Sequence, residues 1–545
     1  MLLGLVMDRS LSVDLLLWRA ERVFGDKLVI ARDARDELKS RRYADIAHRV
    51  RRLSGGLRAL GVEPGHRVAT MCWNTIEHLE VYFATPALGA VVHAINFRLR
   101  PEQVLGTLLR GGARVVVVDH DQLELLAAIA DGLPDLEHVV VAQGVPGTDR
   151  IGAASVHLYE DLVLGSAPVE PVEVDERAAA ALCFTSATTG EPKGILYSHR
   201  SLVLHSMQLS AHDGYGVREA MRVAAVSPMF HSNGWGVPYA AALQGATLIL
   251  PGPRPDAESL VALVHRTSAT HLNAAVTIGV AIRDWAREQD VAEQLRSLHE
   301  MWLGGQAPTP ALIKWFSENV GAEVFQGWGL TETAVITFNR PSAAEREQLT
   351  AEELFQLGVR QGAPGPLAEI DLVDETGARL PWDGKSVGEY VVRGPAVVGA
   401  YWEDPERSAK ALHDGWLLTG DLGVIDPDGN LRVLDRRGDM IKSGGEWIPP
   451  RDLENRLSMH PKVADVAVVG IPDEKWVERP AAWIVPTDPA DPPTSEELRA
   501  FLAESCERWW IPDRFDIVAA LPRTGVGKTD KRTIRSLARD GSTSS

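Results

Sequence analysis

The chain has 545 residues, of which 45% are hydrophobic and 24% are charged, as is ordinary for a folded globular protein. These proportions exclude a disordered chain, a collagen and a coiled coil. The 74 acidic residues outnumber the 56 basic residues, which gives a formal net charge of −18. Because a nucleic-acid backbone requires clustered cations, we expect no nucleic-acid partner, and an anionic ligand must meet cations that are gathered locally.

The three cysteines, Cys72, Cys183 and Cys506, lie far apart and form no CxxC pair, which favours a reducing cytosol. The apolar run before Asp8 is too short for a signal peptide and has no basic segment before it. No apolar stretch is long enough to span a bilayer. We therefore expect a soluble, cytoplasmic protein without an integral membrane segment, for which peripheral membrane contact stays open.

A faint internal repeat organises the first half of the chain. Three short segments recur after 154 to 156 residues: 67–71 as 222–226, 88–92 as 244–248, and 100–102 as 254–256. Each copy predicts a strand, an apolar helix, a strand, a helix that starts at proline, and a further strand at 115–119 or 270–274. Such alternation is typical of parallel α/β sheets, so residues 21–339 are expected to form two related lobes. Since all α/β units look alike, true duplication and chance likeness both stay open.

From Gly362 onward, the pattern of alternating strands and helices gives way to short strand-like runs. Short strand-like runs at 369–373, 388–393 and 431–434 alternate with turns and predict a β-rich subdomain in the form of a distorted barrel. A compact α+β unit follows, with a helix over 450–459, a strand over 463–469 and a helix near 495–506. We place the domain joint at 435–438, which gives an N-terminal domain of residues 1–435 and a C-terminal domain of residues 436–545.

One loop carries the residue types that bind a polyphosphate. Hydroxyl side chains, a glycine and a lysine supply O–H and N–H donors and a cation. These residues are Thr185, Ser186, Thr188, Thr189, Gly190 and Lys193, with Ala187 among them. The spacing is not that of a Walker loop, and Ser/Thr/Gly loops without a ligand are common. The loop alone therefore favours phosphate binding only slightly.

Five ordered motifs resemble those of the adenylate-forming superfamily, which comprises acyl-CoA synthetases, luciferases and adenylation domains of peptide synthetases. They are the segments 185–194, 327–333, 419–421, 435–436 and 522–528. Two further segments, 228–239 and 441–448, resemble those of bacterial medium- and long-chain fatty acyl-CoA synthetases. The resemblance covers nearly the whole chain. It implies a ligase that activates a carboxylic acid with ATP and Mg²⁺ as acyl-AMP and transfers the acyl group to CoA, and it allows a homodimer.

The resemblance also implies roles in adenylation. Glu332 would hold Mg²⁺, with Thr185 as a second or near ligand. Thr331 would hydrogen-bond the α-phosphate, Arg436 would assist at the ribose and phosphate, and Lys528 would bridge the attacking carboxylate and the α-phosphate.

The nucleotide would lie on neighbouring motifs. Trp328 would offer a flat face to adenine, where the family more often has tyrosine, and Asp421 would accept both ribose hydroxyls. The other residues that the resemblance assigns to this site are Gly304, Gly305, Gln306, Gln326 and Gly327. Each residue has an ordinary alternative, such as a turn position for Asp421 or a core position for Trp328.

The acyl pocket is implied to involve His231 and Trp235, and Val237, Tyr239 and Gly305 are expected to line its channel. Trp235 would be a gate between the acyl channel and the nucleotide site, or else an aromatic that packs a helix. His231 would shape the pocket, or else be a buried histidine with ordinary hydrogen bonds. Medium-chain fatty acids are the first choice, and short branched, thioether-containing and aryl acids stay open.

The thiol step would use another face of the C-terminal domain. In the family this small domain is mobile: it rotates about the joint, removes the Lys528 loop and brings in the loop that begins at Lys442. Lys442 would orient the adenylate or ease thiol attack, or else be an ordinary solvated lysine. The residues implied to line the pantetheine tunnel are Gly444, Gly445, Glu446 and Trp447.

Two departures from the family pattern bear on the rate of adenylation. Ala187 replaces a usual glycine, at a cost of about 1–2 kcal/mol if its φ must be positive, and Glu191 adds a negative charge near a polyanion. Two rival functions follow: a ligase that loads a carrier protein, and a binding protein with degraded catalysis. The intact Glu332, Asp421 and Lys528 argue against the second rival.

Overall fold

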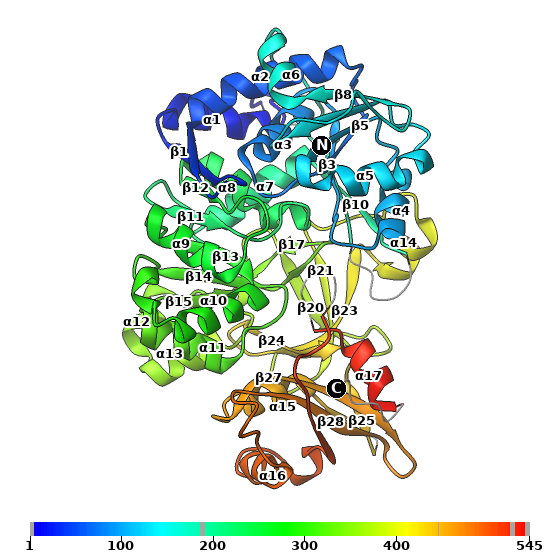
Figure 1. Ribbon diagram of the computed structural model, residues 1–545. Helices are drawn as coiled ribbons and strands as arrows, with labels where there is room; N and C mark the ends of the chain where they lie inside the picture. The colour runs from blue at the N-terminus through cyan, green and yellow to red at the C-terminus, as the bar shows by residue number, and fades with distance from the viewer. Residues whose placement is uncertain (1–4, 186–190, 445, 524–528, 540–545) are drawn as a thin grey trace.

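Two mainly parallel sheets form the larger part of the molecule in the computed structural model, which describes residues 5–185, 191–444, 446–523 and 529–539 (Figure 1). The first lobe has the strand order β10 (Gly194–Ser198), β9 (Ala179–Phe184), β4 (Val91–Ala94), β3 (Arg67–Met71), β5 (Val115–Asp119), β6 (His138–Ala142), β8 (Ala154–Leu158) and β7 (Arg150–Ile151). The second lobe has the order β15 (Glu323–Gln326), β14 (Glu300–Gly304), β13 (His271–Ala275), β11 (Arg222–Ala225), β12 (Thr247–Leu250), β1 (Leu28–Arg32) and β2 (Leu38–Arg42). Only β10, β7 and β2 run antiparallel to their neighbours. The prediction of an α/β fold with two lobes is confirmed.

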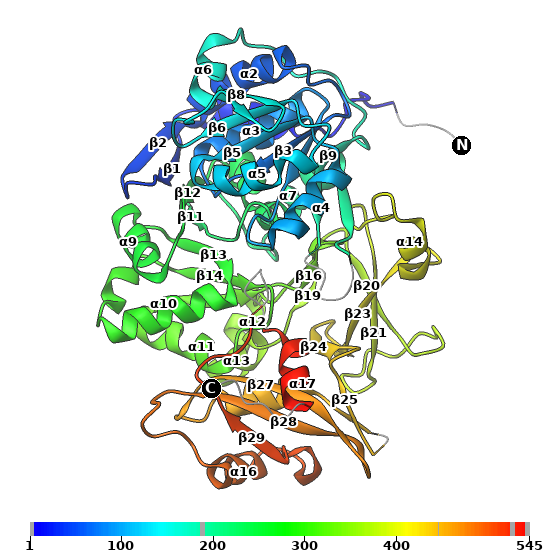
Figure 2. The ribbon, with the colours of Figure 1, turned by 45° about the vertical axis from the view of Figure 1, so that its right-hand side comes forward.

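Helices cover both sheets (Figures 1 and 2). Those of the first half are α1 (Asp14–Phe24), α2 (Tyr43–Ala59), α3 (Ile76–Ala87), α4 (Pro101–Gly111), α5 (Leu123–Ile129), α6 (Tyr159–Gly165), α7 (His199–Ser210) and α8 (Val237–Gln244). Those of the second lobe that follow are α9 (Ala257–Thr267), α10 (Val276–Glu288), α11 (Pro310–Trp315), α12 (Ala343–Gln348) and α13 (Ala351–Gly358). No helix in the described part of the chain is long and apolar enough to cross a membrane.

The internal repeat reappears in the register of the two sheets. β3 lies between β4 and β5, just as β11 lies between β12 and β13. Arg67 pairs with Val91 in the first sheet, and Arg222 pairs with Thr247 at the equivalent place in the second. The two lobes therefore share the topology that the recurring segments predicted.

Two details of the repeat differ from the prediction. The second sheet is completed by β1 and β2, which precede the whole first lobe in the sequence, because β1 pairs in parallel with β12. The lobes are therefore not consecutive segments. The helix expected to start at Pro255 begins at Ala257, because the carboxylate of Asp256 accepts the N–H of Ser259 and caps the helix one residue after the proline.

The β-rich subdomain is an open antiparallel sheet in the described residues, rather than the barrel we expected. Its strands are β20 (Glu369–Val373), β21 (Gly388–Arg393), β23 (Trp416–Ile425) and β22 (Leu412–His413), and β24 (Leu431–Arg436) also pairs with β23. Helix α14 (Pro405–Ala411) precedes β22, and two short ribbons, β16 (Gly329–Leu330) with β17 (Ala334–Val335) and β18 (Thr337–Phe338) with β19 (Ala363–Pro364), connect it to the second lobe. Asp421 thus lies within a strand and not in a loop.

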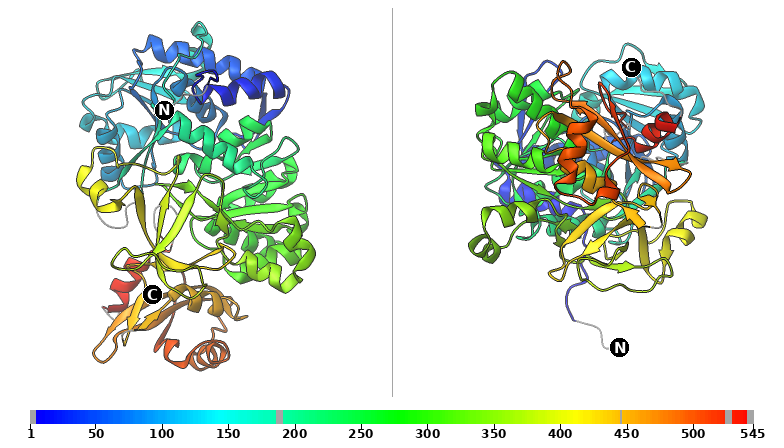
Figure 3. Two further views of the ribbon diagram at one scale, coloured as in Figure 1. Left: turned by 180° about the vertical axis from the view of Figure 1, so that it is seen from behind. Right: turned by 90° about the horizontal axis from the view of Figure 1, so that it is seen from below.

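The C-terminal part lies beyond β24 and holds its own sheet (Figure 3). Its elements are β25 (Ile441–Ser443), β26 (Glu446–Ile448), α15 (Pro450–Leu457), β27 (Val463–Asp473), β28 (Val477–Pro486), α16 (Ser495–Ala503), β29 (Arg514–Ile517) and α17 (Lys531–Arg539). At the predicted joint, Asp435 is buried and its Oδ2 lies 2.7 Å from the Nζ of Lys531. This ammonium also lies 2.9 Å from a carboxylate oxygen of Glu454. Burial would raise the pKa of Asp435, but the charges of Lys531 and Arg451 and the hydrogen bonds to the carboxylate together hold that pKa below its ordinary value.

Buried histidines predict a loss of stability in mild acid. Burial lowers the pKa of His78 and His205 to about 4 and that of His93 to about 3, from about 6.5 in an unfolded chain. Their contribution to stability is therefore complete above pH 6.5 and is lost as the pH falls, because only the unfolded chain takes up the protons. At pH 5 each histidine should cost about 2 kcal/mol. We expect His93→Leu to reduce the stability difference between pH 7.5 and pH 5 by about this amount in denaturant unfolding. An unchanged pH dependence in the variant would contradict this account.

Candidate functional site

The predicted phosphate loop is closed at its base by its own backbone. The N–H of Thr185 donates to the carbonyl of Lys193 at 2.9 Å, and the N–H of Lys193 donates to Oγ1 of Thr185 at 3.0 Å. These two bonds hold together the ends of the loop that connects β9 with β10. The loop residues Ser186, Ala187, Thr188, Thr189 and Gly190 lie outside the described residues, so the effect of Ala187 stays a prediction.

A second turn brings Glu332 to the ammonium of Lys193. The turn connects β16 with β17, and the N–H of Leu330 donates to Oγ1 of Thr333 at 2.8 Å within it. The Oη of Tyr197, on β10, donates to the carbonyl of Thr331 at 2.5 Å. Oε1 of Glu332 lies 3.4 Å from Nζ of Lys193. The structure therefore places together two predicted motifs that are 139 residues apart in the sequence.

Tyr401 completes this cluster, and our sequence analysis missed it. Its Oη lies 3.0 Å from Oε1 of Glu332 and 3.0 Å from Nζ of Lys193. The only signal in the sequence is an aromatic pair, Tyr401 and Trp402, between Gly399 and the helix start at Asp404. That signal suggests a turn, and it gives no indication that the phenol reaches Glu332.

A second polar group contains Trp328, Asp421 and Arg436. Asp421 on β23 is the direct cross-strand partner of Arg436 on β24. Its Oδ1 lies 2.6 Å from Nε of Arg436, and its Oδ2 accepts a hydrogen bond from Nε1 of Trp328 at 2.7 Å. A tyrosine has no such N–H, so the unusual tryptophan gives Asp421 a partner. A ribose would have to share or displace these partners.

The ring of Trp328 is buried in the core of the β-rich subdomain, with its centre 5.5 Å from that of Tyr390. This is the ordinary alternative that the sequence left open. Gln326 is also buried: its Nε2 donates to the carbonyl of Gly358, and its Oε1 accepts from the side chain of Gln361. Because this amide is already used in the interior, the geometry does not support a nucleotide role for Gln326. The adjacent Gly327 leaves no room for a larger residue, because a Cβ at this position would lie 2.6 Å from Cγ1 of Val335.

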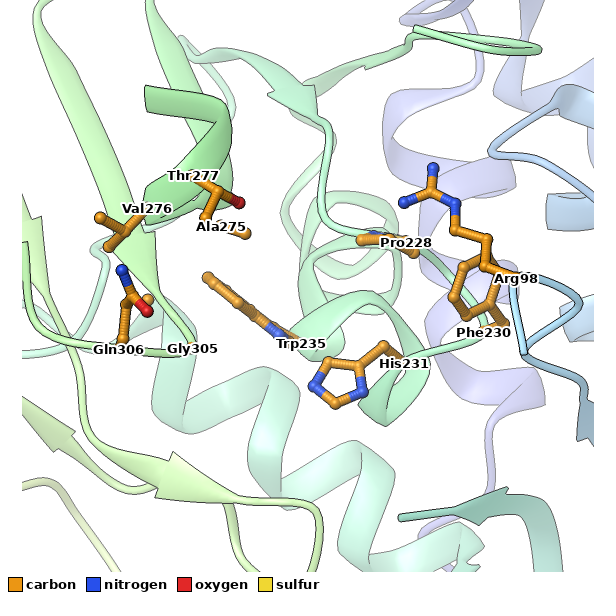
Figure 4. A pocket seen from close by; sticks show the side chains of 11 residues that line it. Arg98, Pro228, Phe230, His231, Trp235, Ala275, Val276, Thr277, Gly305 and Gln306 are labelled. Carbon is orange, nitrogen blue, oxygen red and sulfur yellow. The ribbon is translucent and has the colours of Figure 1, made fainter. Parts of the chain in front are cut away.

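A narrow cavity of about 30 Å³ lies at the end of β14 (Figure 4). Its lining includes five of the predicted site residues: His231, Trp235, Gly304, Gly305 and Gln306. Trp235 lies on the short helical turn Ser232–Gly236 with a φ of +56°, which is unusual for a bulky residue, and the residue is 7% exposed. A Cβ on Gly304 would lie 2.8 Å from Cη2 of Trp235, so the glycine makes room for the indole.

Val237 and Tyr239 do not line this cavity. Both are fully buried on α8, where Tyr239 stacks on Tyr82 of α3 with ring centres 5.6 Å apart. Both side chains belong to the hydrophobic core that contains residues of both lobes, because this face of helix α8 packs against the core. Arg98 was not predicted from the sequence; it lines the cavity, and its guanidinium lies over the rings of Trp73 and Phe230.

The loop predicted for the thiol step lies on the C-terminal sheet. Lys442 is exposed, and its Nζ lies 5.3 Å from the ring centre of Trp447. Gly444 has a φ of +61°, and its N–H donates to the carbonyl of Trp476. No hydrogen bond or ion pair among the described residues joins Lys442 to the Glu332 cluster. Gly445, Lys528 and the side chain of Glu446 lie outside what the structure describes.

Comparison with known proteins decides the family. The model of the AMP-binding enzyme family matches residues 17–402, and that of the AMP-binding enzyme C-terminal domain matches residues 452–528. The chain belongs to the AMP-binding enzyme family. It therefore has the fold and the motifs of the adenylate-forming superfamily, and the resemblance seen in the sequence is confirmed.

Similar proteins cover the chain almost completely. A long-chain-fatty-acid–CoA ligase of Thermus thermophilus is 42% identical over 532 residues, covering 97% of this chain and 96% of that protein. A 3-methylmercaptopropionyl-CoA ligase of Ruegeria lacuscaerulensis is 37% identical and covers 99% and 100%. The crystal structure of the anthranilate CoA ligase AuaEII with anthranoyl-AMP is 26% identical, covers 99% and 98%, and has a TM-score of 0.86. The chain is accordingly an AMP-forming acyl-CoA synthetase, an acid–thiol ligase.

Proposed function

We propose that this synthetase activates a medium- to long-chain fatty acid. The observation that carries the proposal is the apolar character of the cavity beside Gly305: Pro228, Phe230, Trp235 and Val276 line it. Such walls suit an alkyl chain whose carboxylate reaches the polar residues at the other end. The similarity to a long-chain-fatty-acid–CoA ligase supports the same class of acid.

The size of the cavity favours a second candidate, a short acid. The cavity beside Trp235 offers about 30 Å³, so we propose that the indole moves when a long acid enters. A short thioether-containing acid needs a smaller displacement. The similarity to a 3-methylmercaptopropionyl-CoA ligase points in the same direction.

The first half-reaction is attack of the carboxylate on the α-phosphorus of ATP, which releases pyrophosphate. Positioning and neutralisation of charge supply most of the acceleration in such a step. We propose that Lys193 and Lys528 neutralise phosphate charge, that Thr331 holds the α-phosphate, and that Asp421 and Arg436 hold the ribose. CoA thiol then attacks the acyl carbonyl of acyl-AMP from the side of Lys442, which forms the thioester, breaks the acyl–phosphate bond and releases AMP.

A magnesium ion fits the residues that are present. No cluster of three or more His, Cys, Asp or Glu exists among the described residues, so the protein alone does not cage a metal there. Mg²⁺ typically takes one or two carboxylates together with phosphate oxygens and water. Glu332 supplies such a carboxylate. It contacts the ammonium of Lys193, while Thr185 accepts a hydrogen bond from the backbone N–H of the same lysine. The ion would neutralise the charge that builds up on the phosphates.

The test is a pyrophosphate-release assay over a panel of acids: 3-methylmercaptopropionate, butyrate, octanoate, palmitate and benzoate, each with CoA or an acyl-carrier protein. Octanoate or palmitate with CoA is expected to give the highest kcat/KM. A clear preference for 3-methylmercaptopropionate or benzoate would overturn the fatty-acid proposal. Thioester formed only on the carrier protein would overturn CoA as the acceptor. ATP binding without turnover would support the rival function, a binding protein with degraded catalysis.

We also propose a cytoplasmic location and a domain joint at Asp435.

Trp235→Ala should change the preference for chain length. Removing the indole enlarges the cavity. The strain of the positive φ stays the same, because alanine carries a Cβ as tryptophan does. Each methylene accommodated in an apolar pocket is worth about 1–3 kcal/mol, so the ratio of kcat/KM for octanoate over butyrate should rise about ten-fold or more. Trp382→Ala, a partly exposed tryptophan of the β-rich subdomain, is the control. An unchanged ratio would show that Trp235 does not limit the pocket.

A further inference from the structure

The segment that carries Tyr401 is bonded to both phosphate-site motifs. The N–H of Val398 donates to the carbonyl of Glu332 at 2.9 Å, and the N–H of Trp402 donates to the carbonyl of Gly194, next to Lys193, at 2.8 Å. The N–H of Tyr401 itself donates to Oγ of Ser408 at 2.9 Å, in the first turn of α14. The backbone of residues 398–402, which includes Tyr401, is therefore held by three hydrogen bonds around the site.

The phenol of Tyr401 lies between the two charged side chains. Its side chain is buried, with 6% of the residue exposed. Because an ionised carboxylate only accepts hydrogen bonds and an ammonium only donates them, the O–H donates to Oε1 of Glu332 and the oxygen accepts from Lys193. Nζ of Lys193 also lies 4.4 Å from the centre of the Tyr401 ring. The direct distance between Lys193 and Glu332, 3.4 Å, is longer than either contact with the phenol.

These contacts all fall on one oxygen of Glu332. Oε1 receives both Tyr401 and Lys193, while Oε2 has no hydrogen bond from any residue that the structure describes. A carboxylate whose one oxygen is fixed by a phenol presents its other oxygen in a defined direction.

We propose that Tyr401 is the positioning residue for the divalent cation that accompanies ATP: its hydroxyl holds Oε1 of Glu332 so that Oε2 is directed to the metal. The inference rests on the proposed role of Glu332 in adenylation. Tyr401 also keeps Lys193 from closing directly on Glu332, which leaves the ammonium available to the phosphates.

The test is binding of Mn²⁺ with ATP, measured by the loss of the free Mn²⁺ signal in electron paramagnetic resonance, without any acid present. Tyr401→Phe removes only the hydroxyl and keeps the ring under Lys193. Since a hydrogen bond to a charged group is worth about 1.5–3 kcal/mol, the affinity for Mn²⁺ in the presence of ATP should fall about ten-fold or more. The Mg²⁺ concentration for half-maximal acyl-AMP formation should rise in parallel, and excess Mg²⁺ should restore the rate.

Tyr43→Phe is the matched control. The hydroxyl of Tyr43 donates to the carbonyl of Ala246 at 2.9 Å, so this variant also loses one buried hydrogen bond, but away from Glu332. It should keep the wild-type Mn²⁺ affinity and Mg²⁺ dependence. If Tyr401→Phe loses only thermal stability, as is expected of Tyr43→Phe, the inference is wrong. If the wild-type protein binds Mn²⁺ with ATP but forms no acyl-AMP with any acid, the proposed function fails, and the Mn²⁺ affinities of the two variants still decide the role of Tyr401.

Discussion

Glu332→Gln is expected to reduce the rate of acyl-AMP formation by about 100- to 1,000-fold, the usual loss when one group that stabilises developing charge is removed. The amide keeps the size of the side chain and can still accept from Tyr401, but it no longer offers a negative oxygen to a metal. Lys193, which loses its charge partner, remains about one-third exposed, so the fold should tolerate the change. Single-turnover measurement with labelled ATP gives the rate of the first step, and supplied acyl-AMP with CoA gives the rate of the second.

The second step should stay close to the wild-type rate in this variant, because thioester formation involves no phosphoryl transfer. Glu369→Gln provides the control: this exposed carboxylate pairs with Arg393 on the neighbouring strand of the β-rich subdomain. It should leave both steps unchanged. Near-normal adenylation in Glu332→Gln would remove Glu332 from the site, and an equal loss in both steps would indicate a damaged fold instead.

Gly438→Pro is expected to damage the two half-reactions unequally, by about ten-fold or more relative to each other. Gly438 lies in the turn after β24, where the N–H groups of Asp439 and Met440 both donate to the carbonyl of Arg436. The turn separates Asp435, which is bonded to Lys531, from the first strand of the C-terminal sheet. Proline fixes φ near −65°, so if the chain rotates at the proposed joint, it should favour one orientation over the other. Rapid-quench measurement of acyl-AMP and thioester formation reports the two rates separately.

Gly438→Ala is the control for this hinge. A Cβ at Gly438 would meet no heavy atom within 4 Å, and its φ is not in the left-handed region. Alanine should therefore be nearly neutral, and lysine should also be mild. If Gly438→Pro slows both half-reactions by the same factor, or slows neither, Gly438 is an ordinary turn glycine and the joint rotates elsewhere.

The sequence by itself determined the fold class, the family and many of the elements. The predicted strands at 67–71, 115–119, 369–373 and 388–393 coincide with β3, β5, β20 and β21, because short apolar or alternating runs between turn residues leave little freedom for another structure. Glu332 and Lys193, as well as Asp421 and Arg436, were predicted to share a site and do lie together. Motif chemistry identifies such pairs because the charged groups are tied to short, ordered sequence patterns.

Only the tertiary structure decided which side chains face one another over long sequence separations. β1 and β2 belong to the second sheet although they precede the first lobe in the sequence, because strand pairing depends on the packing of whole lobes and not on local pattern. Val237 and Tyr239 lie in the core and Trp235 lines the cavity, although all three fall within five residues of sequence. Helix α8 and the strained turn before it direct their side chains differently. The tertiary structure also brought Tyr401 to Glu332, 69 residues away, through backbone bonds that no sequence pattern encodes.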